Sequence, residues 1–225
     1  MNTLVLATAE QEAEFSLKFP NRAYIHTTTP EELAVWLPQA HLVFDFLLHE
    51  QPERLAQYNE LGRGEKLIVF CNAATVQLAA LAAAHGPVNF HLCGVNALPT
   101  FFNREILEVS VLREESKREV DKACVFLATL YELVEDRVGM VTPRVICMII
   151  NEACYTLQEG TATKEDIDLG MKLGTNYPFG PFEWANRIGV KHVYELLAAV
   201  YEDTKDERYK ICPLLKTKYL KGEEF

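Results

Sequence analysis

The sequence has no apolar run long enough to cross a membrane, and its start, MNTLVLATAEQEAEF, has no lysine or arginine. A transmembrane helix needs about 20 mostly apolar residues, and a secretory signal begins with a basic segment. The six cysteines form no C-x-x-C pair, and most of them lie in apolar runs. These absences predict a cytoplasmic protein without membrane contact, whose cysteines are reduced, buried thiols.

Positive charge is also scarce, because 22 lysines and arginines stand against 32 aspartates and glutamates, for a net charge of −10. A chain of this charge is repelled by nucleic acid and by anionic membranes, so neither is an expected partner. Repeats and low-complexity segments are absent as well. The 225 residues, 49% of them hydrophobic, suffice for one large domain or two small ones.

The first half of the chain alternates short apolar runs with helical segments. Strands are expected at 3–7, 22–26, 41–48, 66–71, 88–93, 105–112 and 131–135, and helices at 10–19, 30–37, 51–61, 74–84 and 116–130. Thr29 is placed to cap the second helix, and Ser116 with Glu119 has the spacing of a capping box. This alternation predicts a parallel, doubly wound sheet of the Rossmann-like α/β class.

No strand is expected after Asp136, where the pattern becomes helical. Helices are predicted at 143–158, capped by Thr142, at 164–173, capped by Thr163, and near 190–201. The first of these is apolar on nearly every face, so it needs neighbours on all sides. The sequence therefore predicts a shortened Rossmann-like domain at 1–136 and an all-α domain at 137–225.

The segment NYPFGPFEWANRIG, from Asn176 to Gly189, combines two prolines and two glycines with four aromatic residues. A loop of this composition turns tightly while its aromatic side chains bury a large area. The composition by itself does not identify the surface against which these side chains pack.

Two stretches of the second half, NEACYTLQEGTATKEDIDLGMKLG (151–174) and YPFGPFEWANRIGV (177–190), resemble the C-terminal domain of the 3-hydroxyacyl-CoA dehydrogenases. They stand in the order and at the spacing of that family. The resemblance implies an all-α dimerisation domain, and hence a homodimer formed through residues 137–225. It further implies that the aromatic side chains of 176–189 dock into this domain and its subunit interface. Alternatively, they complete the core of a single chain. The resemblance also implies a preceding Rossmann-like domain, which binds NAD in the family, and an acyl-CoA or other small-molecule ligand.

The first half resembles the same family more weakly. The stretch CGVNALPTFFNREILEV (93–109) follows the family's G-x-H-F-F-N-P…L-V-E-V without a gap, which places Asn96 at the catalytic histidine and Glu108 at its orienting glutamate. Asn72 matches the asparagine of the family's S-N-T-S-S motif. Its substrate-binding serine falls on Ala74, or on Thr75 if the register slips by one residue, and the asparagine of the hinge motif falls on Pro143. Asn96, Glu108 and Asn72 are therefore the candidate site residues, as positional equivalents.

An asparagine at the position of the family's catalytic histidine is expected to reduce the family's activity. Oxidation of an alcohol by hydride transfer needs a base for the hydroxyl proton, and imidazole accepts it near neutral pH. The carboxamide of Asn96 has no useful basicity, although it can form hydrogen bonds. Removal of a general base typically slows a reaction by about 10²–10⁴-fold. Glu108 is the one alternative base that the resemblance offers.

Glycine is missing where a dinucleotide would bind. A Rossmann fingerprint, G-x-G-x-x-G, follows the first strand so that bare backbone meets the pyrophosphate at a helix N-terminus. Here the first strand is followed by TAEQEAEF, in which Glu10, Glu12 and Glu14 carry negative charge. The second strand ends at His26 without an acid for a ribose. We therefore expect no NAD in the usual groove and no other cofactor.

Several readings remain open. The first is a binding or assembly protein of fatty-acid metabolism that has lost the family's reaction. The second is an active dehydrogenase of 3-hydroxyacyl-CoA or hydroxy acids that uses Glu108, and the third is a subunit that pairs with a full-length relative. No metal is expected, although Cys71, His91 and Cys93 offer a weak alternative zinc set.

Overall fold

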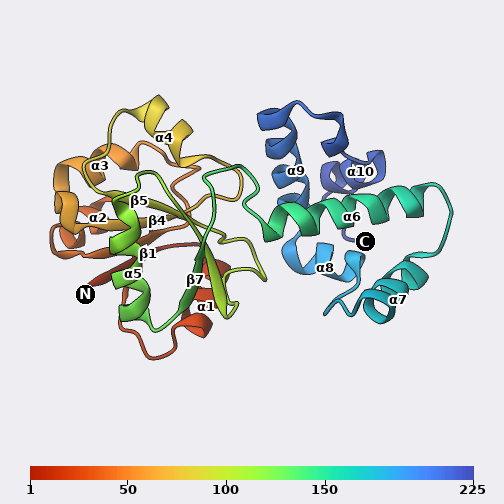
Figure 1. Ribbon diagram of the computed structural model, residues 1–225, viewed down its shortest axis with the longest axis horizontal. Coiled ribbons are helices and arrows are strands. Elements are labelled where there is room, and N and C mark those ends of the chain that lie inside the picture. The colour runs from red at the N-terminus through yellow and green to blue at the C-terminus, as the bar shows by residue number, and fades with distance from the viewer. The chain divides into compact units, whose positions relative to one another are not determined.

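The structure is a computed structural model that describes residues 1–225. It contains two compact units, Met1–Met140 and Val141–Phe225 (Figure 1). The first unit contains every strand, and the second contains only helices. A Rossmann-like α/β region followed by an all-α region is therefore confirmed. The division falls after Met140, whereas the sequence pattern places it near 136.

Seven strands form one sheet in the first unit, in the order β2-β1-β3-β4-β5-β6-β7. The strands are β1 (Thr3–Leu6), β2 (Ile25–His26), β3 (Leu42–Asp45), β4 (Ile68–Asn72), β5 (His91–Val95), β6 (Ile106–Val111) and β7 (Leu130–Leu133). Strands β1 to β5 pair in parallel. Since β2 and β3 lie on opposite sides of β1, the chain reverses its direction of winding at β1 and β3.

Strand β6 runs antiparallel to β5, so the prediction of a wholly parallel sheet is wrong at this point. The connection 96–105 between them contains no helix, and a parallel return needs a crossover of a dozen or more residues. The chain therefore turns back beside β5 and pairs Val95 with Val109. Helix α5 (Ser116–Leu127) then provides the crossover that makes β7 parallel to β6.

Helices cover both faces of this sheet (Figure 1). One face carries α2 (Pro30–Trp36), α3 (Arg54–Leu61) and α4 (Leu78–His85), and the other carries α1 (Ala9–Lys18) and α5. Each face encloses its own core of buried side chains. Strands covered on both sides read as continuous apolar runs, which is why the sequence shows little period-two alternation.

Two of the predicted helix caps are confirmed, and two are wrong. The hydroxyls of Thr29 and Thr163 each accept a hydrogen bond from the backbone N–H three residues later. Ser116 is instead the first residue of α5, fully buried, and its hydroxyl lies 3.0 Å from Nδ1 of His91. Thr142 is likewise the first residue of its helix, Thr142–Gln158. The N-cap position before it is Val141, and no side chain forms a capping hydrogen bond there.

The second unit consists of five α-helices and a 3-10 turn. They are α6 (Thr142–Gln158), α7 (Lys164–Thr175), α8 (Pro181–Ile188), α9 (Val190–Thr204), η3 (Glu207–Tyr209) and α10 (Pro213–Lys221). The aromatic segment was expected to be a loop, but more than half of it is α8, which places Phe182 and Trp184 in the core. The tail helix α10 was not predicted from the sequence.

Helix α6 is tied to the chain before α10 by one buried side chain. Asn151 donates from Nδ2 to the carbonyl of Lys210 at 2.9 Å and accepts at Oδ1 from the backbone of Cys212 at 2.8 Å. Both ends of its amide are therefore used in packing. All six cysteines are buried and unpaired, as predicted. No helix is both long and apolar enough to cross a membrane.

Asp168 connects two stretches of the second unit, EDID (165–168) and GPFE (180–183), by hydrogen bonds. Its carboxylate, on α7, accepts the backbone N–H groups of Phe182 at 2.8 Å and Glu183 at 3.1 Å, and so caps α8 from outside. A Cβ at Gly180 would overlap this carboxylate, so only glycine lets the two elements approach. The acid satisfies N–H groups that a helix start leaves unpaired and also complements the helix dipole.

Replacement of Asp168 by Ala is expected to lower the free energy of unfolding by roughly 1–2 kcal/mol, the range for loss of a side-chain cap. Urea unfolding monitored by circular dichroism measures this change. Glu165→Ala is the matched control, because Glu165 lies on the same helix with its side chain 76% exposed. Equal losses of unfolding free energy in the two variants would show that the hydrogen bonds from α8 to Asp168 do not stabilise the protein.

Candidate functional site

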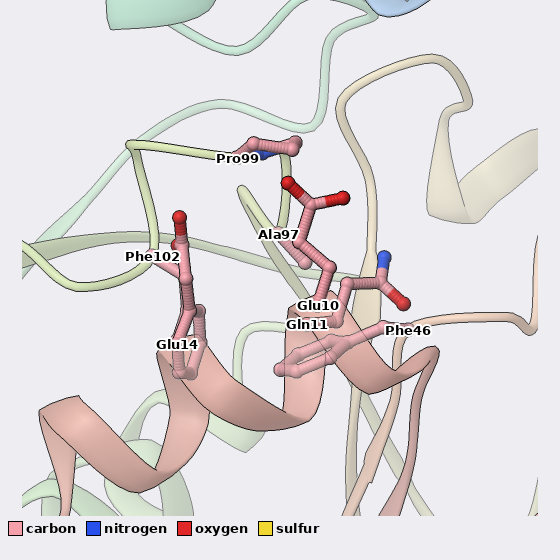
Figure 2. A pocket seen from close by; sticks show the side chains of 7 residues that line it. All are labelled: Glu10, Gln11, Glu14, Phe46, Ala97, Pro99 and Phe102. Atoms are coloured by element: carbon pink, nitrogen blue, oxygen red, sulfur yellow. The ribbon is translucent and has the colours of Figure 1, made fainter. Parts of the chain in front are cut away.

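A narrow crevice without room for a water molecule, called the pocket below, lies at the carboxyl end of β1 and β3, where the winding reverses (Figure 2). In open α/β sheets this is where ligands bind. Helix α1 contributes three polar side chains to it, and the segments after β3 and β5 contribute the rest. The lining residues are Glu10, Gln11, Glu14, Phe46, Ala97, Pro99 and Phe102.

The turn from β1 into α1 uses its own hydrogen-bonding groups. The hydroxyl of Thr8 accepts the N–H of Gln11 at 3.3 Å, and the side-chain oxygen of Gln11 accepts the N–H of Thr8 at 3.0 Å. This is a capping box, which T-x-x-Q in the sequence indicates but which we did not predict. The N–H groups that a Rossmann turn offers to a pyrophosphate are here partly occupied by the chain itself.

Carboxylates of α1 make the same region negative. Glu12 lies 3.2 Å from Nδ1 of His26 and accepts a hydrogen bond from Tyr24 at 3.3 Å. Glu14 accepts the backbone N–H of Thr100 at 2.6 Å. Glu10 lines the pocket beside them. At the end of β2, His26 is therefore paired with Glu12. The negative charges of the carboxylates on α1 would repel a phosphate.

Aromatic rings fill the space beneath the pocket. Phe46 and Phe102 lie with ring centroids 4.9 Å apart in an edge-to-face arrangement, and both are fully buried. Phe15 of α1 packs against both of them, at 6.5 and 5.9 Å. Close approach of a dinucleotide backbone needs bare glycine here. The residues present therefore do not fit a bound dinucleotide in this crevice.

A second helix start at the same edge of the sheet is also occupied. Asp136 accepts the backbone N–H groups of Leu78 at 2.8 Å and Ala79 at 2.9 Å, and its carbonyl accepts a hydrogen bond from Gln77. The N-terminus of α4 is thus neutralised by a carboxylate of the chain. A phosphate would have to displace that carboxylate to bind there.

Asn96 and Glu108 both adjoin the last pair of the β5–β6 ladder. Strand β5 ends at Val95, paired with Val109, so Asn96 follows one member of that pair and Glu108 precedes the other. Asn96 is 5% exposed, and its Oδ1 accepts the N–H of Leu98 at 3.2 Å. Its Nδ2 has no hydrogen-bond partner. The amide therefore does not donate to Glu108.

Glu108 is near a cation of the same connection. Burial lowers the pKa of Arg104, and the charges of Glu108 and Glu14 oppose that shift. Nε of Arg104 donates to the carbonyl of Thr100 at 3.1 Å. This cation offsets part of the negative charge of both carboxylates.

Asn72 holds two chain segments together. Its Oδ1 accepts the backbone N–H groups of Ala74 and Ala97, both at 3.3 Å. Asn72 is buried, and it ties the end of β4 to the residue that follows Asn96. The structure thus brings Asn72, Asn96 and Glu108 to the same edge of the sheet. In this arrangement Asn72 orients the backbone around Asn96.

Sequence reasoning missed a buried ion pair at the end of β3. Nη1 of Arg54 lies 2.8 Å from Oδ1 of Asp45, and the hydroxyl of Tyr58 donates to Oδ2 at 2.8 Å. Burial raises the pKa of Asp45, while the charge of Arg54 and the hydrogen bond from Tyr58 counteract it. The only sign of this ion pair in the sequence was an acidic residue, Asp45, at the end of an apolar strand. Its partners are buried on α3, so the pair holds the fold together.

The proposed zinc alternative has no counterpart in the structure. No three cysteine, histidine or acidic side chains are placed to hold a metal ion. His91 instead contacts Ser116, and its Nε2 lies 3.4 Å from Glu65. Burial raises the pKa of Cys71 and of Cys93, which keeps both thiols protonated.

A family model described as 3-hydroxyacyl-CoA dehydrogenase, C-terminal domain, matches residues 139–224, and the match to full-length relatives extends into the first unit. The chain belongs to the 3-hydroxyacyl-CoA dehydrogenase family. The assignment of Asn96, Ala74 and Pro143 to the family's histidine, serine and hinge asparagine positions stays a prediction from the sequence, as does that of Asn72 and Glu108.

Named relatives are similar to parts of this chain. 3-Hydroxyadipyl-CoA dehydrogenase of Escherichia coli (strain K12) is 41% identical over 87 residues, which make up 39% of this chain and 18% of that protein. 3-Hydroxybutyryl-CoA dehydrogenase of Bradyrhizobium diazoefficiens is 32% identical over 161 residues, or 69% of this chain and 53% of that protein. The chain thus spans about half of these relatives or less.

A solved structure of the family has the same fold. The crystal structure of (S)-3-hydroxybutyryl-CoA dehydrogenase PaaH1 from Ralstonia eutropha matches with a TM-score of 0.74. The match covers 99% of this chain and 86% of that chain, at 22% identity. At this level of identity the likeness concerns the fold alone.

Proposed function

We propose that this protein is a cytoplasmic, 3-hydroxyacyl-CoA dehydrogenase-like protein of fatty-acid metabolism that binds an acyl-CoA-type ligand without oxidising it by means of NAD. The observation that supports this proposal is the turn between β1 and α1, which has a capping box and glutamates in place of a glycine-rich sequence. Unpaired, buried cysteines in a chain of this kind fit a reducing compartment.

The residue at the position of the catalytic base supports the same proposal. Asn96 cannot accept a proton, and its Oδ1 is already engaged by the N–H of Leu98. Ala74 offers no hydroxyl to a substrate. The rival function is an active dehydrogenase in which Glu108 is the base, and it is favoured only by the place of Glu108 opposite Asn96.

Wild-type protein and Asn96→His are both expected to be inactive with 3-hydroxybutyryl-CoA and NAD⁺. Restoring imidazole alone leaves Ala74, Pro143 and the occupied crevice unchanged. Nicotinamide absorbance measures turnover, and calorimetry with NAD⁺ and NADH measures cofactor binding. Wild-type turnover near the median enzyme rate of about 10 s⁻¹ would support the Glu108 mechanism instead. Activity in Asn96→His alone would show that only the base has been lost.

We also propose a homodimer formed through the helical unit. Helix α7 has no buried residue, and its Leu169 and Leu173 are 54% and 78% exposed. Val145 of α6 is exposed as well. Large apolar side chains grouped on one unit mark an association surface. Phe182 and Trp184 are buried within their own unit, so they contribute to its core.

Leu173→Asp is expected to convert the dimer to a folded monomer, because a carboxylate at the interface loses its hydration on association. Light scattering should give twice 25.5 kDa for the wild type and 25.5 kDa for the variant. Phe182→Asp should instead prevent folding, since its ring is buried. A wild-type chain that stays monomeric at high concentration would reject the homodimer and favour pairing with a full-length relative.

A further inference from the structure

Lys18 lines a cavity that lies outside the site described above. The cavity has a volume of ≈ 370 Å³ and is found where helices α1 and α5 end. Cavities of this size take small organic ligands. Its polar lining residues are Lys18, Asn21 and Arg22, and apolar residues such as Phe19 and Leu127 form the remainder. The cavity therefore combines basic side chains with an apolar wall.

The amino group of Lys18 is held by two neutral acceptors from a distant part of the chain. Its Nζ donates to the backbone carbonyl of Glu105 at 3.2 Å and to the backbone carbonyl of Arg104. Burial lowers the pKa of Lys18, and the charges of Cys124 and Glu105 oppose that shift. A larger share of this amine is therefore neutral at neutral pH than of an exposed lysine.

The hydrogen bonds of Lys18 favour nucleophilic attack by the neutral amine. A neutral primary amine has two N–H groups and one lone pair, whereas an ammonium group has three N–H groups and no lone pair. The two carbonyl contacts of Lys18 use both N–H groups of the neutral form. The lone pair is then left for an electrophile, and lysines activated by desolvation act as nucleophiles.

Two neighbouring side chains supply hydrogen-bond donors at the same cavity. The guanidinium of Arg22 lies 4.9 Å from the ring centroid of Phe126, and the side chain of Asn21 is exposed. Attack of an amine on a thioester places negative charge on the carbonyl oxygen, and N–H donors stabilise that charge. The positive charge of Arg22 also attracts the phosphates of coenzyme A. The cavity thus offers a nucleophile and donors together.

We propose that Lys18 accepts the acyl group of short-chain acyl-CoA thioesters that bind in this cavity. Its Nζ attacks the thioester carbonyl, so that a C–N bond forms and the C–S bond breaks. The proton that the nitrogen loses passes through solvent to the thiolate of the departing coenzyme A. This inference rests on the proposed function, because it takes acyl-CoA as the ligand, and it adds a covalent modification site.

Incubation of the full chain with acetyl-CoA, followed by peptide mass spectrometry, tests the inference. We expect Lys18 to be acetylated about ten-fold faster than Lys122, at a rate that saturates with the concentration of acetyl-CoA. Lys122 is the internal control, because it lies on α5 and its amine is paired with the carboxylate of Glu119. Arg22→Gln should slow acetylation of Lys18 about five-fold, through loss of a cationic donor.

The outcomes separate the inference from the proposed function. If calorimetry shows that acetyl-CoA binds but Lys18 reacts no faster than Lys122, the inference falls, while the binding function stands. A rate that rises linearly with concentration and is unchanged in Arg22→Gln would also overturn it, because the amine would then react without a binding site. Absence of both binding and acetylation would reject the proposed function and the inference together.

Discussion

Replacement of Arg54 by Met is expected to lower the free energy of unfolding by about 3–5 kcal/mol, the range for breaking a buried ion pair. The guanidinium is almost fully buried and lies 2.8 Å from the carboxylate of Asp45, which is itself buried. Met fills a similar volume but leaves the carboxylate with only Tyr58 and the backbone of Leu47 as donors. The loss therefore comes from an uncompensated charge rather than from a cavity.

This variant should also acquire a characteristic pH dependence. Without Arg54, burial raises the pKa of Asp45 further above its unfolded value of about 3.9, so the folded state binds the proton more tightly. Its stability should then be highest at low pH and fall as the pH rises through the raised pKa. Urea unfolding at pH 5 and pH 8 measures both effects. Arg118→Met, on an exposed face of α5, is the control, and an equal loss there would contradict the prediction.

Replacement of Phe15 by Ala is expected to lower the free energy of unfolding by about 3–5 kcal/mol, as for other large-to-small changes of buried aromatic residues. The ring of Phe15 is fully buried and makes edge-to-face contacts at 5.0 Å with Phe19, Tyr24 and Phe44. It also supports Phe46 and Phe102, which form the floor of the crevice.

Urea unfolding of Phe15→Ala, with Leu17→Ala as the control, tests this role. Leu17 lies on the same helix but is 67% exposed, and such substitutions usually change stability by less than about 0.5 kcal/mol. Should Phe15→Ala unfold like the control, the aromatic cluster would not be the core of this unit. A large loss would instead show that the crevice is closed by side chains on which the fold depends.

Local signals in the sequence were reliable where neighbours along the chain decide the structure. Thr29 and Thr163 cap their helices because the hydroxyl and the N–H that it accepts lie within one turn. The apolar runs became strands because both faces of the sheet are covered. The absence of glycine after β1 is visible in the sequence, and the structure places a capping box of Thr8 and Gln11 at that turn.

Local patterns failed where a distant residue supplies the partner. Ser116 has the spacing of a capping box, yet its hydroxyl bonds to His91, which is buried against it. The start of α8 is capped by Asp168, a residue on the preceding helix that no local rule connects to it. The antiparallel pairing of β6 with β5 could have been predicted from the sequence, because the connection between the two strands is too short for a helical crossover.

The sequence by itself determined the family and the alternation of strands and helices in the first half of the chain. These properties depend on residue identity and on spacing along the chain. Only the tertiary structure decided that the amide of Asn96 is unpaired, that Thr100 is strained, and that Arg54 neutralises Asp45. Each of these depends on which atoms from separate segments meet, and that is set by packing between elements, not by the local sequence.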